Sequence, residues 1–446
     1  MYKFLLQFLV IVLSIVGCGG GENSSVTMIS GGGLQGEGVG PDIGYDYVQK
    51  INNMPVFIDR GPENIFSMAQ ANILYATVKV CEPGTDKCLD IDHVQVDTGS
   101  VGLRVLASKV KQLNLPPVVL SSNGDSGIAT YSHECYPFVI GGLWGPNKIA
   151  DVVLGKQTAT VLPIQLIQDD PAASPTVPSN CSDAANGAIL SSASALGSNG
   201  ILGIGSVKLD CGQICLSGDY SNSYVQYYSC PADVANSQDC RSAAVPSNFQ
   251  VFNPIAALPA HNNGVVLVLP LVTGLGASKV NGELIFGINT SQNNALPSTA
   301  SRVQLGVDWQ NNFSSYLSVS TNYKGTQIAN SYLDTGTNAL FFADSAIANC
   351  WQSTWFCPTT TLHLSAVMSD GDHPSDNKVT VNFDIGNAEA YFSTSNSAFP
   401  LLGGTYQSPS SNALSFSWGL PFFYGRRTFL SIWQQSGAEN GPWYAF

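Results

Sequence analysis

One short motif occurs twice in this chain of 446 residues, with about half of the sequence between its two copies. Asp97-Thr98-Gly99-Ser100 follows an apolar segment, and so does Asp334-Thr335-Gly336-Thr337. A single Asp-Thr-Gly is usually a turn, because Asp and Thr bond their own backbone and Gly supplies a positive φ. Two copies, each with a hydroxyl residue three places after Asp, predict two similar halves whose loops face each other.

Facing loops of this kind would bring the carboxylates of Asp97 and Asp334 into contact. Two carboxylates in contact cannot both ionise cheaply, so the pair is expected to hold one proton over a wide pH range. The ionised member can take a proton from a shared water, and the protonated member can polarise a carbonyl oxygen. The two aspartates are therefore candidate catalytic residues for the hydrolysis of a peptide bond.

Composition favours strands and limits the partners. Only 11 % of the residues are charged, against roughly 25 % on average, and the chain contains 44 Gly and 24 Pro. These features predict an all-β chain of short strands joined by turns. The formal charge of −13 leaves no basic footprint for a phosphate backbone, so a nucleic-acid partner is excluded.

Local patterns place individual elements along the chain. Asn281-Gly282, between two short apolar runs, predicts a hairpin turn. Helical patterns are scarce, and residues 105–113 and 343–350 are the best short candidates. Apolar runs that are mostly rich in β-branched residues predict strands at 73–78, 93–96, 151–154 and 264–269.

The N-terminus has the pattern of an export signal. Lys3 precedes an apolar run over residues 4–16, which is too short to cross a bilayer but suits a secretory signal. The run ends at Gly17-Cys18 and resembles a bacterial lipobox, in which the cysteine is lipidated; an ordinary signal peptide is the alternative. Residues 19–45 are rich in Gly and Ser and predict a flexible tether. Gly19 after the cysteine favours the outer membrane if the host is Gram-negative.

The chain has eleven cysteines, an odd number. Assigning Cys18 to a lipid leaves an even set, which in an exported chain predicts disulfides. A zinc site is the alternative, but the histidines form no ligand cluster with the cysteines and no paired CxxC occurs. Proximity in sequence predicts the pairs Cys81–Cys88, Cys135–Cys181, Cys211–Cys215, Cys230–Cys240 and Cys350–Cys357.

Three further segments occur in the order found in pepsin-like aspartic proteases. Residues 199–205 resemble the segment that supports the first catalytic loop, and residues 416–424 resemble the matching segment of the second lobe. Residues 283–289 resemble the strand between the lobes. Over about residues 70–446 the chain therefore resembles a bilobal pepsin-like aspartic protease. The stretch from Asp97 to Arg104 is also similar to an uncharacterised family of bacterial exported proteins.

This resemblance implies a fold and roles for the residues of the loops. It implies an all-β, bilobal fold with two barrel-like lobes, no cofactor and no metal, and an extended polypeptide substrate in the cleft between the lobes. The threonines after the two aspartates would brace the loops against each other, and the hydroxyl residues three places after the aspartates would hydrogen-bond the carboxylates. This supporting set is Thr98, Gly99, Ser100, Thr335, Gly336 and Thr337.

The sequence departs from the pepsin pattern around the flap. Arg104 stands where pepsins carry a tryptophan that bonds the flap tyrosine. A cation near the dyad would lower the carboxylate pKa values. The flap itself is expected at residues 135–145, where Tyr136 and Trp144 are the candidates for the place of the flap tyrosine. Substrate preference and pH optimum depend on these residues.

The expected organisation is a membrane-tethered monomer of two lobes. Its parts are a signal peptide over residues 1–18, a tether over 19–45, an N-terminal lobe over 46–260 with a Cys-rich surface insertion at 206–250, and a C-terminal lobe over 261–446. Two functions fit this organisation, an active aspartic endopeptidase and an inert pepsin-like lipoprotein that acts as a binding module. The presence of both aspartates favours the endopeptidase.

Overall fold

The computed structural model describes the folded part of the chain with several gaps. The predicted signal peptide, Cys18 and the tether before residue 41 lie outside the described residues. Within those residues, no helix is both long enough and apolar enough to span a bilayer. The described residues are 41–62, 71–121, 129–170, 177–185, 187–218, 225–231, 240–306, 317–406, 414–433 and 442–446.

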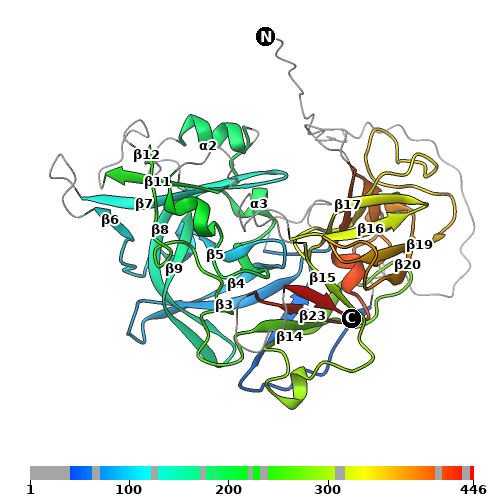
Figure 1. Cartoon of the computed structure of the whole chain (residues 1–446), viewed down its shortest axis with the longest axis horizontal. Helices are drawn as coiled ribbons and strands as arrows, with labels where there is room; N and C mark the ends of the chain where they lie inside the picture. Colours follow the sequence, from blue (N-terminus) through cyan, green and yellow to red (C-terminus); the bar gives the residue numbers. More distant parts are fainter. Residues whose placement is uncertain are drawn as a thin grey trace, which may run out of the picture. The chain divides into compact units, whose positions relative to one another are not determined.

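The described residues form a large sheet system of 17 strands and a separate sheet of seven strands, and the predicted all-β, bilobal pepsin-like class is confirmed. The first lobe, cyan to green in Figure 1, holds most of the large system. Its strand β5 is buried at every position because β10 and β9 flank it. Its strands are β3 (Tyr75–Cys81), β4 (Cys88–Asp97), β5 (Val101–Leu106), β6 (Val119–Ser121), β7 (Thr130–Phe138), β8 (Gly141–Leu154), β9 (Gln157–Ile167), β10 (Gly200–Ile204), β11 (Gln226–Pro231) and β12 (Arg241–Ser242).

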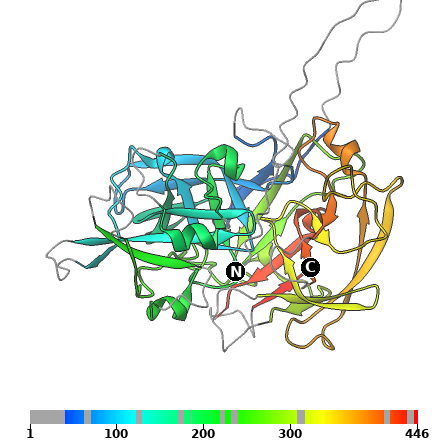
Figure 2. The same ribbon diagram turned by 90° about the horizontal axis from the view of Figure 1, so that it is seen from above.

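Strands from the start, the middle and the end of the chain continue the large sheet system. Strand β14 pairs with β2, and β13 pairs with β23, so segments far apart in sequence lie side by side, as Figure 2 shows. The strands of this region are β1 (Asp42–Ile43), β2 (Asn53–Ile58), β13 (Gly264–Val268), β14 (Lys279–Phe286), β15 (Arg302–Gln304), β23 (Arg427–Ser431) and β24 (Trp443–Ala445).

The second lobe contains the seven-stranded sheet, in the order β20-β19-β16-β17-β22-β18-β21. Its core is aromatic, with the rings of Phe342, Phe416 and Trp418 packed on one another. Buried aromatic rings contribute large apolar areas, so this stack stabilises the lobe. The strands are β16 (Val319–Tyr323), β17 (Thr326–Leu333), β18 (Leu340–Phe342), β19 (Leu362–Ser369), β20 (Val379–Ile385), β21 (Gly403–Thr405) and β22 (Ser415–Trp418).

Helices in the described residues are short. Residues 105–113 contain the helix α1 (Ala107–Val110), but the predicted helix at 343–350 is wrong, because this segment consists of turns. In it, the Asp344 carboxylate accepts the Ala346 amide, a local bond that competes with a helix. The other helices are α2 (Ser179–Ala184), α3 (Ala193–Leu196), α4 (Ala388–Phe392) and 3₁₀ turns at Gly212–Leu216, Gln292–Asn294 and Leu420–Phe423.

The hairpin predicted at Asn281-Gly282 is also wrong, because both residues lie inside strand β14 and pair with β2. Glycine at position 282 allows close packing of the strands and does not form a turn. A Cβ at this position would lie 2.5 Å from the Leu269 side chain and 2.6 Å from the Val268 carbonyl oxygen. A glycine in a strand often marks such a close approach.

All five predicted disulfides are present: Cys81–Cys88, Cys135–Cys181, Cys211–Cys215, Cys230–Cys240 and Cys350–Cys357. In the described part of residues 206–250, Cys211, Cys215 and Cys230 are fully buried, and β11 pairs with β7 of the first lobe. These cysteines belong to small clusters separate from the main core. The surface insertion at 206–250 and the boundary at 260/261 both remain predictions.

Candidate active site

The two predicted catalytic aspartates occupy equivalent positions in the two lobes. Asp97 is the last residue of β4, and Asp334 directly follows β17. In the first lobe β10 pairs with both strands that flank the loop, β4 and β5. In the second lobe β22 pairs in the same way with β17 and β18. The segments at 199–205 and 416–424 thus lie where the pepsin resemblance implies.

The two loops are braced against each other by their threonines. The Thr98 amide donates a hydrogen bond to Thr335 Oγ1, and the Thr335 amide donates one to Thr98 Oγ1, each at 3.0 Å. The hydroxyls donate in turn to backbone carbonyls of the opposite lobe, at Leu333 (3.3 Å) and Val96 (2.8 Å). Both threonines are buried, so this network of four hydrogen bonds fixes the distance between the two loops.

Each carboxylate is held by donors from its own loop. Ser100 Oγ donates to Asp97 Oδ2 at 2.5 Å, and the Gly99 amide donates to Oδ1 at 2.7 Å. The second loop repeats this pattern around Asp334, with the Thr337 hydroxyl and the Gly336 amide both at 2.7 Å. Thr98, Thr335, Ser100 and Thr337 therefore make the contacts that the pepsin resemblance implies, while their part in catalysis stays a prediction.

The two glycines allow the carboxylates to meet. A Cβ on Gly99 would lie 2.7 Å from Asp334 Oδ1, and a Cβ on Gly336 would lie 2.6 Å from Asp97 Oδ1. Both distances are shorter than normal Cβ contacts, so a side chain in either loop would displace the opposite carboxylate. The two carboxyls face each other in the resulting space, because a Cβ on Gly336 would also lie 3.0 Å from Asp334 Oδ1.

The environment of the pair keeps a proton on it. Burial raises the pKa of Asp97 to about 8, and the charge of Asp334 and the hydrogen bond between the two carboxyls act in the same direction. The donors Ser100 and Gly99 oppose this shift but are weaker causes. A buried pair of this kind is protonated once at neutral pH.

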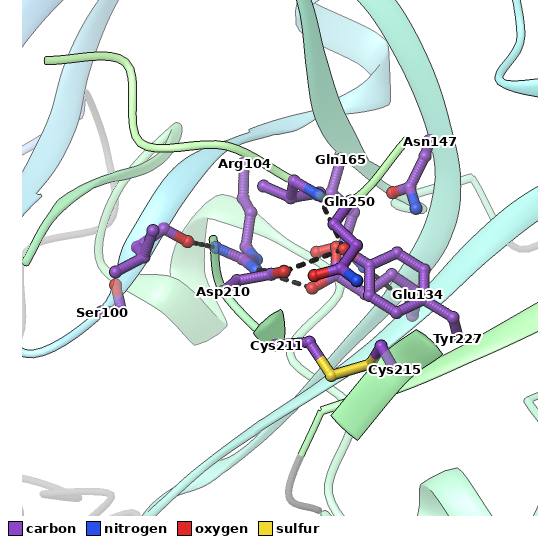
Figure 3. Close-up of polar contacts among 12 residues, drawn as sticks. Ser100, Arg104, Glu134, Asn147, Gln165, Asp210, Cys211, Cys215, Tyr227 and Gln250 are labelled. Atoms are coloured by element: carbon purple, nitrogen blue, oxygen red, sulfur yellow. Dashed lines mark hydrogen bonds and ion pairs between the residues drawn. A yellow bond between two sulfur atoms is a disulfide. The ribbon is translucent and has the colours of Figure 1, made fainter. Parts of the chain in front are cut away.

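Arg104 does not act as a cation that lowers the pKa of Asp97, which is raised, and Figure 3 shows the acids that bind Arg104 instead. The Arg104 guanidinium is fully buried and donates to Glu134 Oε1 at 2.6 Å and to Asp210 Oδ2 at 2.8 Å. Tyr227 holds Asp210 in place with its hydroxyl, 3.0 Å from Oδ1. The guanidinium is therefore paired with Glu134 and Asp210 rather than with the two aspartates of the loops.

The two flap candidates lie on opposite faces of the hairpin formed by β7 and β8. Tyr136 pairs with Leu143, and the adjacent pair joins Cys135 to Trp144, so the side chains of Tyr136 and Trp144 alternate in direction. Trp144 is 1 % exposed and packs between His133 and Tyr228, which removes it as a flap candidate. Burial is the main cause that raises the pKa of Tyr136, and the charge of Asp97 acts in the same direction.

Two residues that support the loops were not predicted. Gln95 Nε2 donates to the Gly336 carbonyl at 3.1 Å, and the Tyr444 hydroxyl donates to the Leu333 carbonyl at 2.8 Å. Gln95 carries a weak signal, because it is the polar residue between Val94 and Val96 in an apolar strand. Tyr444 carries none, since it reaches the loop from the last strand of the chain.

The described residues offer one group of three side chains of the metal-ligand type, Cys350, Cys357 and Glu389. The two sulfurs of this group form a disulfide, so they are not thiolate ligands. The group lies in the second lobe, in a segment that contributes nothing to the two loops described above.

The protein is therefore of the all-β class with a pepsin-like fold, and it carries two facing Asp-Thr-Gly loops. The chain belongs to a family of proteins of unknown function (DUF3443), whose model matches residues 48–446. Among solved structures, it is similar to an aspartic proteinase from Irpex lacteus. That comparison has 16 % identity and a TM-score of 0.44, and covers 88 % of this chain and 96 % of the other. No curated protein matches the chain.

Proposed function

We propose that this protein is an aspartic endopeptidase that hydrolyses extended polypeptides with a water activated between Asp97 and Asp334. The observation that carries the proposal is the contact between the two carboxyls. Their Oδ1 atoms both lie within 3.0 Å of the position that a Gly336 Cβ would occupy, and each carboxyl is held by equivalent donors from its own loop. A turn with a purely structural role needs neither equivalent donors in the two loops nor two acids buried against each other. The burial of these acids raises the pKa of Asp97.

The chemistry follows from the single proton on the pair. Asp97 carries the proton, because its pKa is raised to about 8. Asp334 accepts a proton from a water held between the carboxyls, and the oxygen of that water attacks the carbonyl carbon of the substrate. Asp97 donates a hydrogen bond to the carbonyl oxygen, which gains negative charge in the transition state. Asp334 then gives the proton that it took from the water to the leaving nitrogen, the carbonyl re-forms as the C–N bond breaks, and the two fragments are released with Asp97 still protonated.

The flap offers an apolar tip to the substrate. Val139 and Ile140 connect β7 to β8 and are 79 % and 73 % exposed. Exposed large apolar residues at a loop tip favour contact with another chain. An unfolded, apolar stretch of polypeptide is therefore the proposed substrate, and a single copy of the protein holds both aspartates.

Activity is expected to extend to neutral pH and to fall on the alkaline side. Because the pKa of Asp97 is raised, the catalytic proton stays on the pair until the pH passes about 8. Above that value kcat/KM should drop about tenfold per pH unit. Cleavage rates from pH 3 to pH 10, with folding followed by circular dichroism at each pH, measure this. An alkaline limb centred below pH 5.5 would contradict the assignment.

The competing proposal is an inert module that binds polypeptide without cleaving it. The two differ in how they treat a peptide whose scissile carbonyl is replaced by a secondary alcohol, since that group mimics the tetrahedral intermediate. An endopeptidase should bind this analogue at least about a hundredfold more tightly than the parent peptide, whereas a binding module should bind both equally. Isothermal titration calorimetry at pH 5 and pH 7 measures the ratio. Asp334→Asn, which removes the proton acceptor, should reduce the preference.

We also propose that the protein is exported and anchored to a membrane, the outer membrane in a Gram-negative host, by a lipid on Cys18. The support is the apolar run that ends at Gly17-Cys18 and the Gly-rich stretch after it. Cells fed labelled palmitate should incorporate the label into the wild-type protein and not into Cys18→Ala. Equal labelling of both proteins would contradict the anchor. The mature mass should also match ten oxidised cysteines.

A further inference from the structure

A buried arginine connects the first catalytic loop to the flap. Arg104 lies on β5, just after the loop, and its Nη1 donates to the Val101 carbonyl at 2.5 Å. The guanidinium carbon is 3.8 Å from the centroid of the Tyr136 ring, and Tyr136 belongs to the flap strand β7. At this distance a guanidinium and an aromatic face attract each other, and the attraction is stronger away from water.

The flap strand supplies an acidic partner as well as the ring. Glu134 and Tyr136 are two positions apart on β7, so their side chains leave the strand on the same face. Glu134 is fully buried and accepts the guanidinium at 2.6 Å, and Gln165 donates to the Glu134 carbonyl at 2.8 Å. One arginine therefore holds the flap strand at two points.

The second acid fixes the orientation of the guanidinium. Asp210 accepts from Arg104 and from Tyr227, whose hydroxyl also accepts the Val251 amide at 2.7 Å (Figure 3). Burial and the adjacent Glu134 raise the pKa of Asp210. The cluster of Arg104, Glu134, Asp210 and Tyr227 is thus a connected network of buried hydrogen bonds.

The Tyr136 ring packs against this cluster through Arg104. Its hydroxyl makes no hydrogen bond with the described residues, and burial raises its pKa. The tip of the hairpin, at Val139 and Ile140, is exposed. The hairpin is held to the lobe by the ring contact and the Glu134 bonds, and also by the pairing of β7 with β11, the Cys135–Cys181 disulfide and the backbone hydrogen bonds of Gly142 with Ala188 and Leu190. Among these attachments, the contact with Arg104 acts on the Tyr136 side chain itself.

We infer that Arg104 is a positioning residue that clamps the Tyr136 ring and so fixes the flap over the two aspartates. Its effect on turnover rests on the proposed function, whereas its effect on the flap does not. The clamp acts on a tyrosine that approaches the substrate and leaves the dyad's proton unaffected. Loss of the clamp should therefore raise KM more than it lowers kcat, and should leave the pH profile in place.

The test uses variants that keep the buried charges balanced. Tyr136→Leu removes the ring and leaves the ion pairs intact, and Tyr136→Phe keeps the ring. The triple variant Arg104→Met/Glu134→Gln/Asp210→Asn removes the clamp without leaving an unpaired charge. Tyr131→Leu is the matched control, because it makes the same change on the same strand, away from Arg104.

Amide hydrogen exchange of residues 136–142 in the folded domain is the first readout, and it needs no activity. Tyr136→Leu and the triple variant should exchange about tenfold faster than wild type, while Tyr136→Phe and Tyr131→Leu should not. Unchanged exchange in Tyr136→Leu, or equally fast exchange in Tyr136→Phe, would overturn the clamp. If the wild type cleaves peptides, KM should rise about tenfold in the same two variants. If it does not, the proposed function fails and the exchange data still decide the clamp.

Discussion

Asp97→Asn and Asp334→Asn should each reduce the cleavage of an unfolded protein by at least about a thousandfold. The pair works as one unit that holds one proton, so the loss of either carboxyl removes either the proton acceptor or the acid. Groups that act as a unit are not additive, and the double variant should be about as inactive as each single one. Cleavage of a fluorogenic peptide over pH 3–8 measures the loss.

These variants are expected to fold, which keeps the experiment interpretable. The pKa of Asp97 is raised in the folded state, so folding is favoured by protonation and loses stability as the pH rises from about 4 to about 8. Asparagine is neutral, so Asp97→Asn should be at least as stable as wild type at pH 7. Asp90→Asn, an exposed change on the same strand β4, is the matched control and should keep full activity. An active Asp334→Asn would contradict the mechanism.

Removal of the disulfide between Cys135 and Cys181 should cost about 4 kcal/mol of unfolding free energy, because this bond closes a loop of 46 residues. The Cys81–Cys88 bond closes only 7 residues, and its removal should cost about 2.4 kcal/mol by the same relation. The Cys135–Cys181 disulfide also links α2 to the flap strand β7, next to Glu134 and Tyr136. Urea denaturation of the two double alanine variants compares them.

The comparison is matched, because each variant removes one bond and leaves four. Equal losses for the two variants, or a larger loss for the shorter loop, would contradict the loop-length argument. The Cys135→Ala/Cys181→Ala variant should also expose the flap strand to faster hydrogen exchange, whereas the Cys81→Ala/Cys88→Ala variant should not.

The parts of the site that could be predicted from sequence are those encoded by short, repeated segments. Asp97 and Asp334 stand out because the same turn occurs twice after an apolar strand, and glycine in each turn is explained by the approach of the opposite carboxylate. The disulfides were predictable because four of the five pairs are local. In these cases short sequence patterns identify the residues, although the contact between Asp97 and Asp334 joins residues far apart in sequence.

The remaining parts depend on contacts between residues far apart in sequence. Glu134 and Asp210 appear as ordinary acids in a chain, and only the packing of β5, β7 and the segment before the Gly212–Leu216 turn brings them to one arginine. The role of Arg104 therefore differed from the expectation based on its charge alone. Likewise, Asn281-Gly282 has the local signal of a turn, but close packing against Val268 and Leu269 keeps it in a strand.

The most direct test of the account is the search for new peptide termini after the folded domain, expressed without residues 1–40, is incubated with an unfolded apolar protein. Mass spectrometry in ¹⁸O-water at pH 4–8 should find internal cleavage sites with one ¹⁸O atom in each new carboxyl terminus. Asp97→Asn should produce none of these fragments. Wild-type domain that is folded, binds the polypeptide and yields no new termini at any pH would contradict the account and favour the binding module.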